Sequence, residues 1–181
     1  MIVTLTLVSV IAGGGLALTY AVTRDRIEEQ RRIDEARAFS AALPAAQRPE
    51  DFSPLADALA AARRQHPEVS GVLEGRADGD LKGYVIVAAP RGYGGPVQMA
   101  VGIDTQGRVT GVAVISGNET PGLGSQALEP PFLSQFKGKT PDQPVRIGQD
   151  VDAISGATRS SVAVATGVRM ALDVYSDQIR R

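Results

Sequence analysis

The chain has 181 residues, of which 43% are hydrophobic and 22% are charged, and its formal net charge is −1 at pH 7. This length and balance are typical of one modest globular domain with an appendage. The charge lacks the basic surplus of a nucleic-acid-binding protein, so we expect no nucleic-acid partner. The chain contains no cysteine, which excludes iron–sulfur clusters, thiolate zinc sites and disulfides within it.

The first segment, Ile2–Val22, contains no charged residue and consists mostly of Val, Leu, Ile, Ala and Gly. As a helix it would be about 31 Å long, which is enough to cross a bilayer. We therefore expect residues 1–23 to form an uncleaved transmembrane anchor. A cleaved signal peptide is the alternative, but the apolar run is longer than usual for one, and it lacks a preceding basic residue and a small-x-small cleavage site.

The charges around this span predict its orientation. Basic residues follow the span and none precedes it: Arg24, Arg26, Arg31 and Arg32. The positive-inside rule then predicts that the C-terminal part of the chain lies in the cytoplasm. A short basic stretch ahead of Met1 would remove the basis for this prediction.

Residues 24–65 are predicted to be a membrane-proximal helical segment. An amphipathic pattern continues the membrane helix up to Leu43-Pro44, where the proline should end it. Residues 47–51 resemble a linker. A second helix is predicted after it, with Ser53 as N-cap and Pro54 at the first helical position.

Residues 66–181 are predicted to be one α+β domain, in which helices flank an antiparallel sheet. Patterns rich in β-formers predict strands at Leu81–Ala89, Val97–Ile103 and Val109–Ser116. The turn Asp104–Gly107 predicts that the last two strands form a hairpin. Further elements are expected as short strands at Val69–Leu73 and Val145–Ile147, a helical turn at Pro131–Phe136 and a final helix around Thr158.

The single histidine, His66, precedes Pro67 at the start of this domain. A lone histidine there is more typical of a surface or capping residue than of a metal ligand or a general base. A Ser–His–Asp hydrolase would have to use it, and the sequence contains no Gly-x-Ser-x-Gly elbow. Hydrolysis by such a triad is therefore disfavoured.

The most informative stretch is Asp152-Ala153-Ile154-Ser155-Gly156-Ala157-Thr158, directly ahead of the last helical pattern. The N-terminus of a helix carries unpaired N–H groups and a partial positive charge, so it binds phosphate readily. Gly156 lets the backbone approach an anion, and Ser155 and Thr158 can cap the helix or contact a ligand. On these grounds alone, an ordinary capped helix after a turn is the alternative.

The order of these residues resembles the flavinylation motif of the small FMN-binding domain. That domain occurs in the G subunit of Rnf electron-transport complexes and in the C subunit of sodium-pumping NADH:quinone reductases. The resemblance implies that Thr158 carries FMN through a phosphodiester, which a separate flavin transferase installs. It places Ser155, Gly156 and Ala157 beside the attached phosphate.

A second stretch, Glu119-Thr120-Pro121-Gly122-Leu123-Gly124, resembles another motif of the same family. The resemblance implies that this loop holds the isoalloxazine ring. Thr120 and Leu123 would form hydrogen bonds to the ring edge, with Glu119, Gly122 and Gly124 nearby. By its residues alone, this stretch is a glycine-rich surface loop. The glycine-rich turn at residues 90–96 would also let a ring or phosphate approach.

Together these motifs imply a single-pass inner-membrane flavoprotein with its FMN domain on the periplasmic face. This orientation is opposite to the one that the positive-inside rule predicts. The covalent FMN would transfer electrons among the other membrane subunits of an Rnf-type ion-translocating ferredoxin:NAD oxidoreductase. The sequence presents no general acid–base pair, so we do not expect this chain to be catalytic alone.

Three alternatives remain at this point. One is a C-type subunit of a sodium-translocating NADH:quinone reductase, although such chains are typically longer. Another is a membrane-tethered FMN-binding regulator without turnover. The last is a hydrolase or nucleotide-binding enzyme with Ser155 or Thr158 as nucleophile, which lacks both a partner base and the lysine pattern of a P-loop.

Overall fold

The computed structural model describes residues 2–180, and its contacts divide the chain into two units, residues 1–35 and 36–181. Helix α1 (Ile2–Ala42) supplies the first unit and continues into the second. In the first unit, α1 is long and apolar enough to cross a membrane, with a mean hydropathy of 2.0 in its most apolar window. Thr6, Thr19 and Thr23 each donate a hydrogen bond to the carbonyl four residues earlier. These hydroxyls are thereby satisfied within the helix, as a lipid environment requires.

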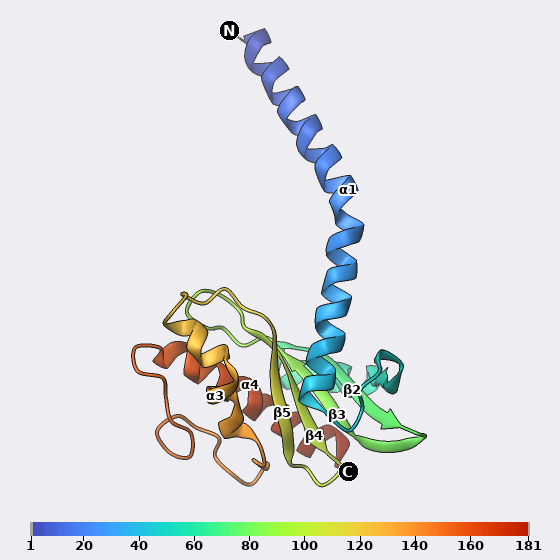
Figure 1. The fold of residues 1–181 in the computed structure, drawn as a ribbon, viewed down its shortest axis with the longest axis vertical. Helices are drawn as coiled ribbons and strands as arrows, with labels where there is room; N and C mark the ends of the chain where they lie inside the picture. The colour runs from blue at the N-terminus through green and yellow to red at the C-terminus, as the bar shows by residue number, and fades with distance from the viewer. Residues whose placement is uncertain (1, 181) are drawn as a thin grey trace. The chain divides into compact units, whose positions relative to one another are not determined.

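The second unit is built on a five-stranded antiparallel sheet with the order β1-β2-β3-β4-β5 (Figure 1). Its strands are β1 (Phe52–Pro54), β2 (Val69–Ala77), β3 (Asp80–Ala88), β4 (Gln98–Asp104) and β5 (Val109–Ser116). The predicted α+β class is confirmed, and so are the three main strands and the β4–β5 hairpin. Gly107 closes that hairpin with a φ of +82°, a left-handed conformation that glycine adopts without strain.

Three further helices complete the unit: α2 (Ala56–Gln65), α3 (Pro130–Leu133) and α4 (Thr158–Val174). The predicted helical turn is confirmed as α3 with a 3₁₀ turn after it, and Phe132 and Phe136 are buried there. Helix α1 ends at Ala42, which confirms the stop predicted from Leu43-Pro44. Helix α4 begins at Thr158, which confirms the final helix.

The predicted start of the second helix is wrong. Ser53 and Pro54 belong to β1, and α2 begins only at Ala56. The segment pairs with β2, and the N–H of Leu55 donates to the carbonyl of Val72 at 2.8 Å. Pairing with a distant strand therefore overrides the local capping signal.

The predicted short strand at Val145–Ile147 is also wrong. Ile147 forms only an isolated bridge with Val151, and Val145 has a φ of +46°, which no regular strand contains. The N–H groups of Val145 and Arg146 donate to the carboxylate of Asp150, at 3.2 and 2.8 Å, instead of to a neighbouring strand. A compact loop around one carboxylate takes the place of the strand.

Both faces of the sheet are covered, because successive side chains of a strand point to opposite sides. Ile86 of β3 belongs to the larger core, which α2 and α4 complete. Val85 and Val87 belong to a second cluster with Ala38 and Ala42 at the end of α1. In Figure 1, α4 passes behind the strands and the last turns of α1 lie in front of them.

Glycines in the sheet let the end of α1 approach closely. A Cβ atom on Gly102 would lie 2.1 Å from the carbonyl oxygen of Ala42, and one on Gly75 would lie 2.4 Å from the Leu43 side chain. The hydroxyl of Thr110 donates to the same Ala42 carbonyl at 2.6 Å. The last carbonyls of a helix have no intrahelical partner, so this bond satisfies one of them and fixes the helix end on the sheet.

The close approach predicts that Gly102→Ala destabilises the domain. The new methyl group would overlap a backbone carbonyl that cannot rotate away, so we expect a loss of about 1–3 kcal/mol in the free energy of unfolding. Denaturant unfolding of the detergent-solubilised chain measures this loss. Gly111→Ala is the control and should lose less stability, because its Cβ would lie farther away, at 3.0 and 3.1 Å from the carbonyl oxygens of Ala41 and Ala42. An equal loss in both variants would contradict the explanation.

Candidate functional site

A cavity of about 450 Å³ lies where three segments of the second unit meet. Tyr93 comes from the turn between β3 and β4, a second group from the loop after β5, and a third from the start of α4. This volume is within the usual range of small-molecule sites. Seven of the residues expected at the site line the cavity: Glu119, Thr120, Leu123, Gly124, Gly156, Ala157 and Thr158.

The loop after β5 turns sharply at Gly122, which lies outside the cavity lining. Its φ of +75° is the left-handed conformation that favours glycine. The carbonyl of Thr120 accepts hydrogen bonds from the N–H groups of Leu123 and Ser125, both at 3.2 Å. Gly122 donates to the Ser125 hydroxyl at 3.0 Å. The turn presents Leu123 at the cavity, where its side chain is still 51% exposed.

The turn before α4 is fixed by a buried serine. Ser161 donates through Oγ to the carbonyl of Ala157 at 3.0 Å and accepts from the N–H of Ile154 at 3.1 Å. Gly156, with a φ of +76°, completes the turn. Ala157 is the N-cap residue and no side chain caps the helix, so neither Ser155 nor Thr158 takes the capping role.

Four hydroxyl groups lie at or beside this turn, and their surroundings differ. Ser160 and Ser161 are only 1% and 0% exposed and both are hydrogen-bonded. Ser155 is exposed but is absent from the cavity lining, whereas Thr158 is exposed and lines the cavity. Of these four hydroxyl groups, that of Thr158 alone belongs to a residue that is both exposed and part of the cavity lining.

Sequence reasoning missed Tyr93, Arg159 and Ser160 as cavity residues. The guanidinium of Arg159 lies 5.7 Å from the centroid of the Tyr93 ring, a cation–π contact across the cavity. Arg159 directly follows Thr158, so its charge was a signal available in the sequence. Tyr93 had a weaker signal, because the glycine-rich turn at residues 90–96 was recognised only as a place where a ring or phosphate can approach.

The chemistry of this lining fits FMN. The first N–H groups of α4 and the guanidinium of Arg159 create a positive region beside Thr158, where a phosphate is stabilised. Leu123 and Tyr93, 51% and 66% exposed, offer apolar surface for a flat ring. Thr120, which is exposed, adds a hydroxyl group to the lining.

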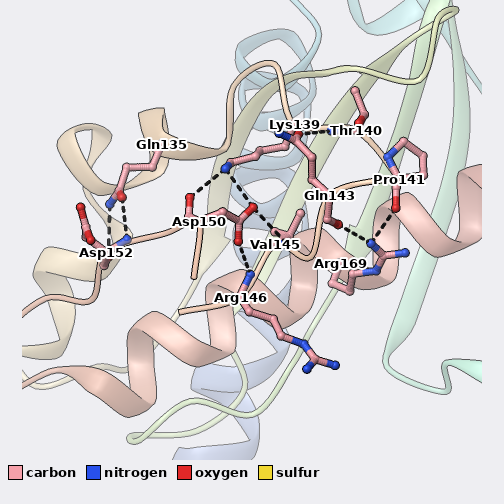
Figure 2. Close-up of polar contacts among 10 residues, drawn as sticks. All are labelled: Gln135, Lys139, Thr140, Pro141, Gln143, Val145, Arg146, Asp150, Asp152 and Arg169. Carbon is pink, nitrogen blue, oxygen red and sulfur yellow. Dashed lines mark hydrogen bonds and ion pairs between the residues drawn. The ribbon is translucent and has the colours of Figure 1, made fainter. Parts of the chain in front are cut away.

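The segment that leads into the turn is held by a second set of polar contacts (Figure 2). The Asp150 carboxylate accepts from the ammonium group of Lys139 at 2.9 Å and from two backbone N–H groups, those of Val145 and Arg146. Gln135 then bonds both backbone groups of Asp152, accepting from its N–H at 2.9 Å and donating to its carbonyl at 3.3 Å. These contacts fix the chain just before Ile154.

Comparison with known proteins finds two family regions in the chain. Residues 92–173 match the FMN-binding domain family, and residues 3–41 match the RnfG N-terminal region. The first match contains both sequence motifs and all the residues that line the cavity. The segment that lines the cavity is therefore part of a region that matches an FMN-binding domain.

Two relatives show to which family the whole chain belongs. The chain is 33% identical to the G subunit of the Na(+)-translocating ferredoxin:NAD(+) oxidoreductase complex of Acetobacterium woodii, over 94% of this chain and 87% of that protein. It is 34% identical to the G subunit of the ion-translocating oxidoreductase complex of Methanosarcina acetivorans, over 98% of this chain and 94% of that protein. The chain belongs to the family of G subunits of ion-translocating oxidoreductase (Rnf) complexes, as its motifs predicted.

Solved structures share the fold. The C subunit of the Na(+)-translocating NADH-quinone reductase from Parabacteroides distasonis superposes with a TM-score of 0.60 at 19% identity, over 83% of this chain and 94% of that chain. Shewanella oneidensis NqrC gives a TM-score of 0.61 at 20% identity, over 82% of this chain and 95% of that chain. At these identities the likeness concerns the fold alone.

The contacts of Asp150 predict how acid affects this region. Partial burial opposes ionisation, but hydrogen bonds from the N–H groups of Arg146 and Val145 and the charge of Lys139 outweigh it and lower the pKa of Asp150 below its usual value. A lowered pKa gives stability that is present above the unfolded-state pKa, near 4, and is lost as the pH falls through the folded-state pKa. We expect Asp150→Asn to reduce stability at pH 7 and to flatten the loss below about pH 4.

Denaturant unfolding measured from pH 7 down to pH 3 tests this expectation. Asp142→Asn is the matched control, because Asp142 is an exposed acid of the same segment. If the free energy of unfolding of Asp150→Asn falls with acid as steeply as that of the wild type, the stabilising role of the Asp150 carboxylate is contradicted.

Proposed function

We propose that this chain is the membrane-anchored flavoprotein subunit of an Rnf-type ion-translocating ferredoxin:NAD oxidoreductase complex, in which it carries covalent FMN and transfers electrons. The observation that carries the proposal is the position of Thr158. It is an exposed hydroxyl at the start of α4, it lines the cavity, and it lies inside the FMN-binding domain match. The attachment is a phosphodiester from the Thr158 Oγ1 atom to FMN, installed by a separate flavin transferase.

Each part of the cavity has a task in this proposal. The first N–H groups of α4 and Arg159 stabilise the single negative charge that remains on a phosphodiester. Thr120 and Leu123 orient the ring through hydrogen bonds at its edge, and Leu123 and Tyr93 shield its apolar part from water. When bound, FMN supplies the one- and two-electron redox chemistry, while the protein supplies position and tuning.

The N-terminal region supports the proposed identity of the complex. The RnfG N-terminal match at residues 3–41 and the G-subunit relatives favour the Rnf type over a C-type subunit of a sodium-translocating NADH:quinone reductase. Solved C-type chains share the fold with this chain, but a likeness of fold does not distinguish the two kinds of complex. A non-catalytic FMN-binding regulator would use the same cavity without partner redox subunits.

The proposed partners are the other membrane subunits of the complex, the flavin transferase and the membrane itself. We propose that residues 1–23 form a single-pass anchor in the inner membrane and that the FMN domain faces the periplasm. Residues 24–65 connect the anchor to the FMN-binding domain at 66–181. From Ala36 onward, this connection is already part of the compact unit, because α1 ends on the sheet and β1 extends it.

The attachment predicts the behaviour of Thr158→Ala. This variant should lose all covalent flavin, while its stability changes by no more than about 0.5 kcal/mol, because Thr158 is exposed and no side chain caps this helix. Thr158→Ser keeps the hydroxyl and should retain flavinylation. Acid precipitation followed by mass spectrometry measures the added mass of FMN less one water.

The protein for this test is produced together with a flavin transferase. Ser155→Ala is the matched control, since it removes an exposed hydroxyl of the same turn outside the cavity lining. Flavin that stays bound to Thr158→Ala through acid precipitation would refute the site. Wild-type protein without any flavin would refute the electron-carrier function.

The absence of cysteine from the chain gives a direct test of orientation. Asp142 is exposed on the loop that precedes the turn before α4. In spheroplasts, a membrane-impermeant maleimide should label Asp142→Cys fully before permeabilisation if the domain faces the periplasm. Labelling that requires permeabilisation would place the domain in the cytoplasm, as the arginines after the span predict. Wild-type protein, which has no thiol, controls for background.

A further inference from the structure

One buried acid joins all three segments of the cavity. The Glu119 side chain belongs to the loop after β5 and is only 7% exposed. Its Oε1 atom accepts from the N–H groups of Tyr93 and Gly94, at 2.9 and 3.3 Å. Its Oε2 atom accepts from the hydroxyl of Ser160 in α4, at 2.6 Å. The three partners come from two segments that are distant from Glu119 in the sequence.

The backbone packs closely against two sides of this carboxylate. A Cβ atom on Gly92 would lie 2.1 Å from Oε1 of Glu119. On the other side, a Cβ atom on Gly124 would lie 2.6 Å from Oε2 and 2.8 Å from the Ser160 hydroxyl. Glycines on both sides thus allow the chain to close around the carboxylate, which accepts hydrogen bonds at both oxygens, as an acceptor-only group can.

We propose that Glu119 is the positioning residue of the flavin site, acting through Ser160 on the first turn of α4 and through two N–H groups on the Tyr93 turn. This inference rests on the proposed function, because it concerns how the FMN cavity is held. Ser160 is two residues after Thr158. The Glu119–Ser160 bond therefore sets the distance between Thr158, the proposed attachment residue, and the loop after β5, which is proposed to hold the ring. The same carboxylate places Tyr93 at the opposite wall.

Glu119 also has an electrostatic consequence. It lines the cavity, so its negative charge acts on a bound flavin through a medium of lower effective dielectric than water. Reduction adds negative charge to the flavin, and a fixed negative charge nearby opposes it. The carboxylate should therefore hold the midpoint potential of the flavin lower than an uncharged side chain would.

The test compares Glu119→Gln, Ser160→Ala and their combination in full-length protein produced with a flavin transferase. Three properties are measured: the initial rate of covalent loading, the visible circular dichroism of the bound flavin and its midpoint potential. We expect each single variant to load about tenfold more slowly, since each disturbs a hydrogen bond to a charged group. The double variant should lose less than the product of the two effects, because the two residues act through one bond.

The midpoint potential of the flavin distinguishes a residue that positions the flavin from one that only supports the fold. Glu119→Gln should shift the midpoint potential to a more positive value and change the flavin dichroism. Ser160→Ala keeps the charge, so it should change the dichroism with a smaller shift of potential. Glu129→Gln, an exposed acid after the same loop, is the matched control and should retain the loading rate, dichroism and potential of the wild type.

Other outcomes are also decisive. If Glu119→Gln fails to fold, Ser160→Ala alone decides, since it keeps the carboxylate and both backbone contacts. Wild-type loading, dichroism and potential in Ser160→Ala and Glu119→Gln would overturn the positioning role and leave the proposed function standing. Wild-type protein that acquires no flavin would refute the proposed function itself.

Discussion

The close packing of α4 on the sheet is the constraint on which the cavity depends. Small residues on the buried side of α4 allow this approach: a Cβ on Gly167 would lie 2.7 Å from the sulfur of Met99 in β4. A helix held this closely cannot slide or rotate without breaking the core. Apolar packing along the whole helix therefore fixes α4 on the strands, and the proposed role of the Glu119–Ser160 bond is to fix the loop after β5 against the first turn of this helix.

The opposite face of the sheet carries the other fixed element. The last turn of α1 lies against glycines, and Thr110 bonds the carbonyl of Ala42 at 2.6 Å. Alternation along β3 makes both attachments possible at once, since Val85 faces α1 and Ile86 faces α4. The sheet thus holds on one side the helix that starts at the proposed flavin residue and on the other the end of the helix that leads from the proposed anchor.

Local signals predicted most of this fold, and contacts with residues distant in the sequence explain two of the misses. The strands β3 to β5 and the Gly107 turn depend on patterns within a few residues, so the sequence predicts them. Ser53-Pro54 carries an equally clear local signal, but pairing with β2 decides its structure. The role of Glu119 was similarly hidden, because it depends on N–H groups 25 and 26 residues away and on a serine 41 residues away. Family motifs predicted the candidate site, whereas the roles proposed for its residues depend on three-dimensional contacts.

The openness of the cavity has a physical reason if FMN is attached at Thr158. Leu123 and Tyr93 remain half exposed or more, so the ring site buries little apolar area and would hold free FMN weakly. A covalent link makes ring binding intramolecular, with an effective concentration in the millimolar range for a short tether. Weak ring contacts then suffice for occupancy, and part of the ring can stay accessible to a partner. A deeply buried ring would be held more tightly, but a partner could not reach it. If FMN is attached at Thr158, the exposed cavity and the exposed hydroxyl at the helix start therefore act together: the attachment retains the cofactor, and the proposed Glu119 network positions it.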